Sequence, residues 1–219
     1  MTLPLLSLLE TRVLGVLVEK QHTVPDTYPL TLNALAAGCN QKTSRDPILG
    51  ATDHEIQACL DNLRGFSLVV ESSGGRVMRY AHNTERVLGV PAQAVALLAT
   101  LMLRGPQTVS ELRLNCERLH RFADASAVEA FLDELRARAQ GALVVELPRR
   151  PGERETRWAH LLSGAPEPQQ AAALPADEGE RVTVSELAAL KANVASLQQE
   201  VGTLKATLAR ICSELGIAD

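Results

Sequence analysis

At 219 residues, with 46% hydrophobic residues and a formal net charge of −4, the chain can bury one large core or two small ones. It lacks the basic excess that usually marks a nucleic-acid-binding protein, although a local basic patch is still compatible with this charge. Charged residues interrupt the apolar stretches near the N-terminus, so we expect neither a signal peptide nor a membrane span and predict a cytoplasmic protein.

Residues 1–90 are predicted to form three helices and a β-hairpin. A capping box at Ser7–Glu10, followed by apolar residues at helical spacing, predicts the first helix, and a second short helix begins near Thr31. A further capping box at Thr52–Glu55 opens the third helix. Strands at residues 68–71 and near 77–81, separated by a Ser/Gly turn, predict the hairpin. Three helices and a hairpin make a winged helix.

The following residues predict the same order of elements. A first helix spans residues 92–104, and a capping box at Thr108–Glu111 opens the second helix. Ser126–Glu129 is predicted to cap the third helix. The hairpin pairs residues 143–147 with residues 156–161. The sequence therefore predicts two winged helices in tandem.

Direct matches between the two halves support this interpretation. Four segments recur in the same order, at offsets of 77, 72, 75 and 78: PLTL at 29–32 with PQTV at 106–109, LDNLR at 60–64 with LDELR at 132–136, LVVE at 68–71 and 143–146, and RYAH at 79–82 with RWAH at 157–160. Four ordered matches indicate one supersecondary unit that is built twice.

The same residues carry a family resemblance. TYPLTLNAL at 27–35, CNQKTSR at 39–45, RGPQT at 104–108 and ELR at 111–113 resemble the YceH family of bacterial proteins. The resemblance covers roughly residues 5–163, so the tail beyond Gly164 lies outside it. It implies tandem winged-helix domains and provides no catalytic residues to carry over.

The tail differs in composition from the repeats. Residues 165–219 carry 4 Lys or Arg against 8 acids, and residues 165–182 are rich in Pro, Ala and acids, which predicts a flexible linker. From Leu187 onward, apolar residues alternate in steps of three and four, which predicts a coiled coil. Its seam comprises Leu187, Val194, Val201, Leu208 and Leu215 at position a, and Leu190, Leu197, Leu204 and Ile211 at position d.

Side-chain shape and charge predict how this helix pairs. Valine at two a positions with mostly leucine at d favours two strands. In a parallel pair, Glu186 would meet Lys191 of the second copy, and Glu200 would meet Lys205, so both contacts join opposite charges. We therefore predict a parallel homodimer. The full prediction is a mainly α-helical α+β chain with winged-helix domains over residues 1–90 and 91–164, a linker over residues 165–182, and a dimerisation helix over residues 183–219.

The third helix of a winged helix usually enters the major groove of DNA, with its N-terminal residues facing the bases. Here these positions carry acids, Asp53 and Glu55 in one repeat and Glu129 and Asp133 in the other. Acids in a first turn also complement the helix dipole, which is a purely structural explanation. On either interpretation, the third helices are poor readers of the groove.

Two other places are more favourable for DNA. Hydroxyls and cations in the turn between the second and third helices could contact phosphates, and arginines of the second hairpin could enter a minor groove. The candidates are Lys42, Thr43, Ser44 and Arg45 in the turn, and Arg149, Arg150, Arg154 and Arg157 in the hairpin. The alternatives are a solvated polar loop and an ordinary charged hairpin.

No sequence motif points to catalysis, a metal or a cofactor. The chain has no GxGxxG, GxxxxGK[ST], HExxH or GxSxG, and its 4 cysteines form no CxxC pair, which predicts buried reduced thiols. His82 and His160 occupy matching positions, which suggests a structural role. We therefore expect a non-enzymatic, DNA-associated transcriptional regulator of helix-turn-helix type, in which dimerisation strengthens weak contacts. The alternative is a protein–protein interaction adaptor that uses the winged helices as docking surfaces.

Overall fold

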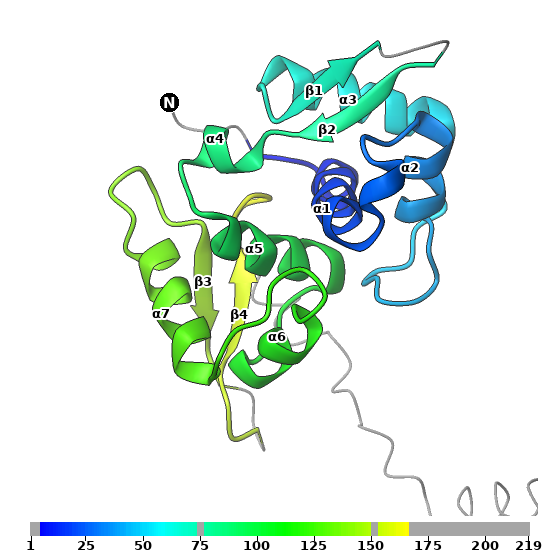
Figure 1. Cartoon of the computed structure of the whole chain (residues 1–219). Coiled ribbons are helices and arrows are strands. Elements are labelled where there is room, and N and C mark those ends of the chain that lie inside the picture. The colour runs from blue at the N-terminus through cyan, green and yellow to red at the C-terminus, as the bar shows by residue number, and fades with distance from the viewer. Residues whose placement is uncertain (1–4, 74–76, 150–152, 167–219) are drawn as a thin grey trace, which may run out of the picture. The chain divides into compact units, whose positions relative to one another are not determined.

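The computed structural model of the chain describes residues 5–73, 77–149 and 153–166 (Figure 1). The chain divides into two units, residues 1–171 and residues 172–219, and every described residue belongs to the first. The described part is mixed α and β, with seven α-helices and two small antiparallel hairpins. This confirms the predicted α+β class. The predicted coiled-coil seam and nearly all of the predicted linker lie outside the described residues.

The first repeat has the predicted order of elements. They are α1 (Leu8–Thr23), a 3₁₀ turn (Pro25–Thr27), α2 (Leu32–Cys39), α3 (Asp53–Gly65), β1 (Val69–Ser72) and β2 (Arg79–His82). The first strand begins one residue later than predicted because Leu68 donates its backbone N–H to Leu63 at the end of α3. The second strand begins at Arg79, whereas residue 77 was predicted.

The second repeat follows after one additional short helix. Its elements are α4 (Thr84–Leu88), α5 (Ala92–Arg104), α6 (Val109–Asn115), α7 (Ala125–Arg136), β3 (Val144–Leu147) and β4 (Arg157–His160). Helix α4, of five residues, was not predicted from the sequence, and its N-cap makes no side-chain hydrogen bond. Its C-cap residue, Gly89, adopts a left-handed conformation with φ of 61°.

Helix caps set most of the helix starts. The predicted capping boxes at the beginning of α1, α3 and α6 are all present. The predicted cap of α7 at Ser126 is wrong. Asp124 has extended backbone angles, and its carboxylate accepts a 2.8 Å hydrogen bond from the Ala127 N–H. An aspartate in this conformation satisfies a free N–H of the first turn, so the helix begins before Ser126.

Both hairpins have the same register and the same additional contact. In the first hairpin Glu71 pairs with Tyr80, and in the second Glu146 pairs with Trp158. Each aromatic residue also forms a bridge to the residue that precedes the N-cap of the second helix of its repeat, Leu30 for Tyr80 and Gln107 for Trp158. The repeat detected in the sequence is therefore also a repeat of backbone pairing.

The first helices of the two repeats pack against each other at the centre of the described part (Figure 1). Residues 10–18 of α1 are all buried, and one continuous core includes side chains from both repeats. Gly15 allows the close approach of α1 and α5, because a Cβ atom there would lie 3.0 Å from Leu103 Cγ. The division into separate domains over residues 1–90 and 91–164 stays a prediction.

Three of the four cysteines lie in the described part. Cys39, Cys59 and Cys116 are buried and free, as predicted for reduced thiols. Burial raises the pKa of Cys39 to about 12 and the pKa values of Cys59 and Cys116 to about 11, so these thiols stay protonated. Across the described residues, no helix is both long and apolar enough to cross a bilayer.

Candidate nucleic-acid interface

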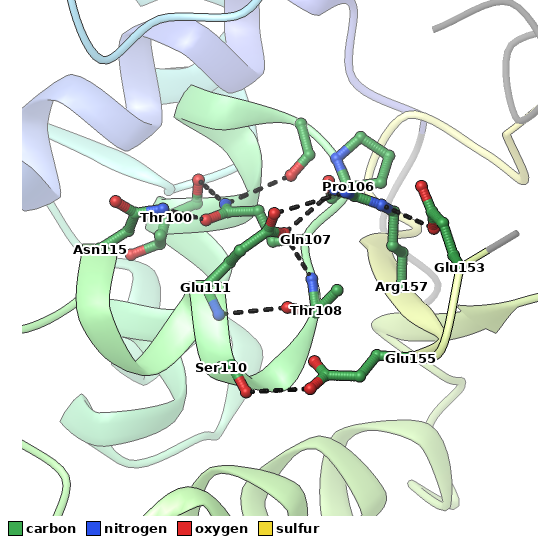
Figure 2. A network of polar contacts seen from close by, with 11 residues as sticks. Thr100, Pro106, Gln107, Thr108, Ser110, Glu111, Asn115, Glu153, Glu155 and Arg157 are labelled. Carbon is green, nitrogen blue, oxygen red and sulfur yellow. Dashed lines mark hydrogen bonds and ion pairs between the residues drawn. The ribbon is translucent and has the colours of Figure 1, made fainter. Parts of the chain in front are cut away.

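Arg157 is the first residue of β4, where the loop of the second hairpin ends, and it lies inside a network of polar contacts (Figure 2). Its Nη1 atom lies 3.0 Å from Glu111 Oε2 and 3.2 Å from the carbonyl oxygen of Pro106. Its Nε atom donates to Glu153 Oε2 at 3.3 Å. Because these partners use several of its donors, Arg157 holds the hairpin on the N-terminal end of α6.

The partner carboxylate has a second task in the same network. Glu111 accepts a 2.8 Å hydrogen bond from the backbone N–H of Thr108 and completes the cap of α6. Nearby, the Ser110 hydroxyl donates to Glu155 at 3.4 Å and makes another link between α6 and the hairpin (Figure 2). The network thus joins a helix start to a strand, and Arg157 is one of its structural members.

The arginines nearer the tip of this hairpin are placed differently. Arg149 follows β3 and Arg154 precedes β4, and both are exposed. Neither makes an ion pair with another residue of the described part. Arg150 lies outside the described residues. The second hairpin therefore has a bonded arginine at the start of β4 and two exposed arginines in the loop between its strands.

Arg45, in the loop between α2 and α3, was predicted to contact phosphate, but its side chain is buried. Its Nη1 and Nη2 atoms lie 3.1 and 2.6 Å from the two carboxylate oxygens of Glu19 on α1. Its Nε atom donates to the carbonyl oxygen of Gly38 at 3.1 Å, and Nη2 also donates to Gln41 at 2.7 Å. Arg45 therefore fixes the loop to α1 and is not on the surface.

The other predicted residues of this loop are exposed. Lys42, Thr43 and Ser44 all face solvent, and Ser44 adopts a left-handed conformation with φ of 58°. The Ser44 hydroxyl accepts a 2.7 Å hydrogen bond from Nη2 of Arg104, at the end of α5. The structure thus brings a residue of the second repeat to this loop, a contact that the sequence analysis did not predict.

A second buried arginine lies beneath the same loop. Arg12 is 0% exposed, and its guanidinium donates to the carbonyl oxygens of Cys39 at 3.2 Å and Pro47 at 2.6 Å. Burial lowers the pKa of Arg12, and the nearby Arg45 lowers it further. The sequence signal for this role was an arginine within the apolar first helix.

The third helices present acids at their exposed N-terminal ends. Asp53 and Glu55 of α3 and Glu129 of α7 are exposed. The backbone N–H and hydroxyl of Thr52 donate to Glu55 and lower the pKa of this carboxyl group, which agrees with a capping role. On α7, Asp133 is 2.7 Å from Arg136. These acids do not favour the approach of a polyanion.

The matched histidines end the second strand of each hairpin. His82 contacts the side chain of Gln21 through Nε2, while its Nδ1 accepts a 3.4 Å hydrogen bond from the Thr84 N–H. The Nδ1 atom of His160 is buried without a partner in the described part. Burial lowers the pKa of each histidine to about 4, so both are neutral at pH 7. In the described residues, no cluster of His, Cys, Asp or Glu could hold a metal ion.

Comparison with known families agrees with the sequence resemblance. Residues 6–153 match the family described as "Protein of unknown function, DUF480". The chain belongs to the DUF480 family. A UPF0502 protein of Dechloromonas aromatica is 60% identical over 205 residues, which cover 94% of this chain and 95% of that relative.

Other relatives are similar to the chain beyond the residues that the family model covers. A UPF0502 protein of Burkholderia lata is 58% identical over 209 residues, covering 95% of this chain and 88% of its own length. A UPF0502 protein of Methylibium petroleiphilum is 59% identical over 215 residues, covering 98% and 92% respectively. The tail beyond Gly164 was expected to lie outside the family resemblance. The family model ends at residue 153, before the tail, in agreement with this expectation, although the 215-residue match with this relative includes tail residues.

Proposed function

We propose that each repeat is a winged helix and that the chain is a non-enzymatic, DNA-associated regulator. In this proposal, the tip of the second hairpin contacts the phosphate backbone. The observation that supports it is the contrast within that hairpin: Arg157, the first residue of β4, is bonded to Glu111 of α6, whereas Arg149 and Arg154 are exposed in the loop between the strands. The bonded Arg157 holds the hairpin on α6 and leaves the two loop arginines available to a ligand.

Such a contact would be electrostatic and would not depend on base sequence. Lysines and arginines that meet phosphates release condensed counterions, and each contact adds about −0.9 to the slope of log affinity against log salt concentration. The acids Asp53 and Glu55 on α3 would oppose insertion of that helix into a groove. We therefore propose backbone binding that is weak for a single hairpin.

Dimerisation would raise this weak affinity. We propose that the heptad residues from Leu187 to Leu215 form a parallel two-stranded coiled coil. A dimer places two second hairpins on one assembly, so the second contact forms at a high effective concentration. Light scattering tests this step: the full chain is expected to be a dimer, and a chain that ends at Gly164 a monomer. The same number of chains per particle in both proteins would contradict it.

The DNA proposal is tested by fluorescence anisotropy of the full chain with a short random-sequence duplex, across a salt series. Binding is expected at low salt, and Arg149→Ala and Arg154→Ala should each lower the salt slope by about 1. Arg86→Ala is the matched control, because it removes an exposed arginine of α4 and should leave the slope unchanged. Absence of binding by the wild-type chain at low salt would refute the proposal.

A protein-interaction adaptor is the second candidate, and one observation favours it. The first hairpin exposes apolar side chains, whereas the second exposes arginines: Val70 is 50% exposed, Val77 58% and Met78 41%. Exposed apolar side chains are more typical of protein contacts than of DNA contacts. If the duplex does not bind but a Val70→Glu, Met78→Glu chain loses a protein partner that the wild-type chain retains, the adaptor function is supported.

A further inference from the structure

We propose that the loop between α2 and α3 and the end of α5 form one composite surface for the phosphate backbone of duplex DNA, with Arg104 as a contact residue. This inference rests on the proposed DNA function and adds a second contact, in a different part of the described structure. Its exposed groups are the Lys42 ammonium, the hydroxyls of Thr43 and Ser44, and the partly exposed Arg104 guanidinium. Cations and hydroxyls of this kind are common partners of phosphate oxygens.

The two repeats build this surface together. Arg104 donates to the Ser44 hydroxyl at 2.7 Å, and the backbone N–H of Asp46 donates to the carbonyl oxygen of Leu103 at 2.8 Å. One link is a side-chain contact and the other is a backbone contact, so the loop is fixed to the end of α5 at two points. Lys42 and Arg104 therefore lie on segments joined to each other.

Buried bonds hold the loop in place from beneath. Arg45 binds both oxygens of Glu19, and Arg12 donates to the carbonyl oxygen of Pro47 at 2.6 Å. A loop fixed in this way loses little conformational entropy when it binds a ligand, so even a few phosphate contacts contribute to affinity. Arg12 and Arg45 are positioning residues in this arrangement, and Lys42 and Arg104 make the contacts.

The local charge has the sign that a phosphate requires. Four cations lie on or beneath the loop: Arg12, Lys42, Arg45 and Arg104. The nearby acid Glu19 on α1 is already paired with Arg45 and with Lys20.

Asp46 is the opposing acid. Its Oδ2 atom lies beside the end of α5, 3.2 Å from the position that a Cβ atom on Gly105 would occupy. A positive excess remains around the loop in a chain whose net charge is −4.

Anisotropy of the full chain with the same random duplex tests the inference. The double variant Lys42→Ala, Arg104→Ala should lower the salt slope by about 2, because it removes two phosphate contacts. Asp46→Asn should change affinity in the opposite direction, since it removes the opposing charge at constant shape. Circular dichroism of each variant checks that the fold is retained. Arg86→Ala again serves as the matched control for loss of one exposed cation.

The outcomes separate this inference from the function on which it rests. If Arg149→Ala weakens binding while the Lys42, Arg104 variant binds like the wild type, the composite surface is refuted and the hairpin contact stands. If the wild-type chain does not bind the duplex at low salt, both are refuted. Weaker binding of the Lys42, Arg104 variant together with tighter binding of Asp46→Asn supports the composite surface.

Discussion

The two repeats share the contacts that hold each hairpin on its helices. In the first, Nη1 of Arg79 donates to the carbonyl oxygen of Pro29 at 2.7 Å; in the second, Nη1 of Arg157 donates to the carbonyl oxygen of Pro106 at 3.2 Å. These residues are equivalent in the sequence repeat. The comparison shows that Arg157 belongs to the framework of the unit, because its contact occurs in both copies.

The loops between the second and third helices are not shared. In the first repeat, buried arginines hold the loop through carbonyl oxygens and a carboxylate. In the second, Phe122 is buried between aromatic neighbours, with ring centroids 4.7 Å from His120 and 5.8 Å from Phe131. The two repeats therefore share the contacts that hold the hairpin and differ in the loop. This is expected when one fold presents two different surfaces.

The largest expected effects come from removing the buried side chain that anchors either loop, Arg12 in the first repeat or Phe122 in the second. Arg12→Ala leaves the carbonyl oxygens of Cys39 and Pro47 without their donor and opens a cavity, so it should lower the free energy of unfolding by about 3 kcal/mol or more. Phe122→Ala should cost about 3–5 kcal/mol through lost packing alone. Urea denaturation measures both.

A second pair of variants separates hydrogen bonding from packing. Arg12→Met fills similar space without donors and should remain destabilised by about 2 kcal/mol, whereas Phe122→Leu should recover most of the lost stability. If Arg12→Met were as stable as the wild type, the hydrogen bonds of Arg12 would not hold the loop, and the proposed difference between the two loops would fail.

The matched histidines predict a common response to acid. Burial lowers the pKa of His82 and of His160 to about 4, below the ordinary value of 6.5. Their contribution to stability is complete above pH 6.5 and is lost as pH falls toward 4, by at most about 1.4 kcal/mol per pH unit for each histidine. Urea denaturation at a series of pH values measures this slope.

Variants of each histidine test whether the repeats respond equally. His82→Gln and His160→Gln should each flatten the pH dependence of stability between pH 6.5 and 4, and the double variant should flatten it more. His54→Gln, which removes an exposed histidine, is the control. A profile that the double variant leaves unchanged would show that neither imidazole is the source of the acid sensitivity.

The sequence predicted features that depend on local patterns. The capping boxes and the hairpin partners follow from residues close in the chain or repeated at a fixed offset, and the structure confirms them. The cap of α7 was misplaced because Asp124 and Ser126 are both good N-caps, and periodicity does not choose between them. The five-residue α4 is too short to give a periodic signal.

The candidate site was predicted less well, because burial depends on distant partners. Arg45 is bonded to Glu19, 26 residues away, and Arg12 to Pro47, 35 residues away, and no local pattern reveals either contact. For Arg157 a signal was present. It begins the tetrapeptide RWAH, and the matching RYAH begins at Arg79. A residue copied with the repeat is more typical of the framework than of a ligand contact.

The smallest expected effect lies in the salt bridges that join each third helix to its hairpin. Arg64 is 2.6 Å from Glu71 in the first repeat, and Arg136 is 3.2 Å from Glu146 in the second. Both arginines are exposed, so the ion pairs alone should contribute little. Of these two arginines, only Arg136 also makes a cation–π contact. Its guanidinium carbon lies 5.3 Å from the centroid of the Trp158 ring.

Arg136→Ala should therefore destabilise the protein more than Arg64→Ala, by about 0.5–1 kcal/mol, the usual range for an exposed cation–π contact. A double-mutant cycle with Arg136→Ala and Trp158→Leu, measured by urea denaturation, isolates this contribution because both ion-pair partners are unchanged when only the tryptophan is replaced. A coupling energy near zero, or equal losses of stability for the two arginine variants, would contradict the assigned difference.

The salt dependence of stability separates the ion pairs from the cation–π contact. High salt should weaken both ion pairs alike, since Arg64 and Arg136 are similarly exposed. Most of the additional loss of stability in Arg136→Ala, relative to Arg64→Ala, should therefore remain at high salt.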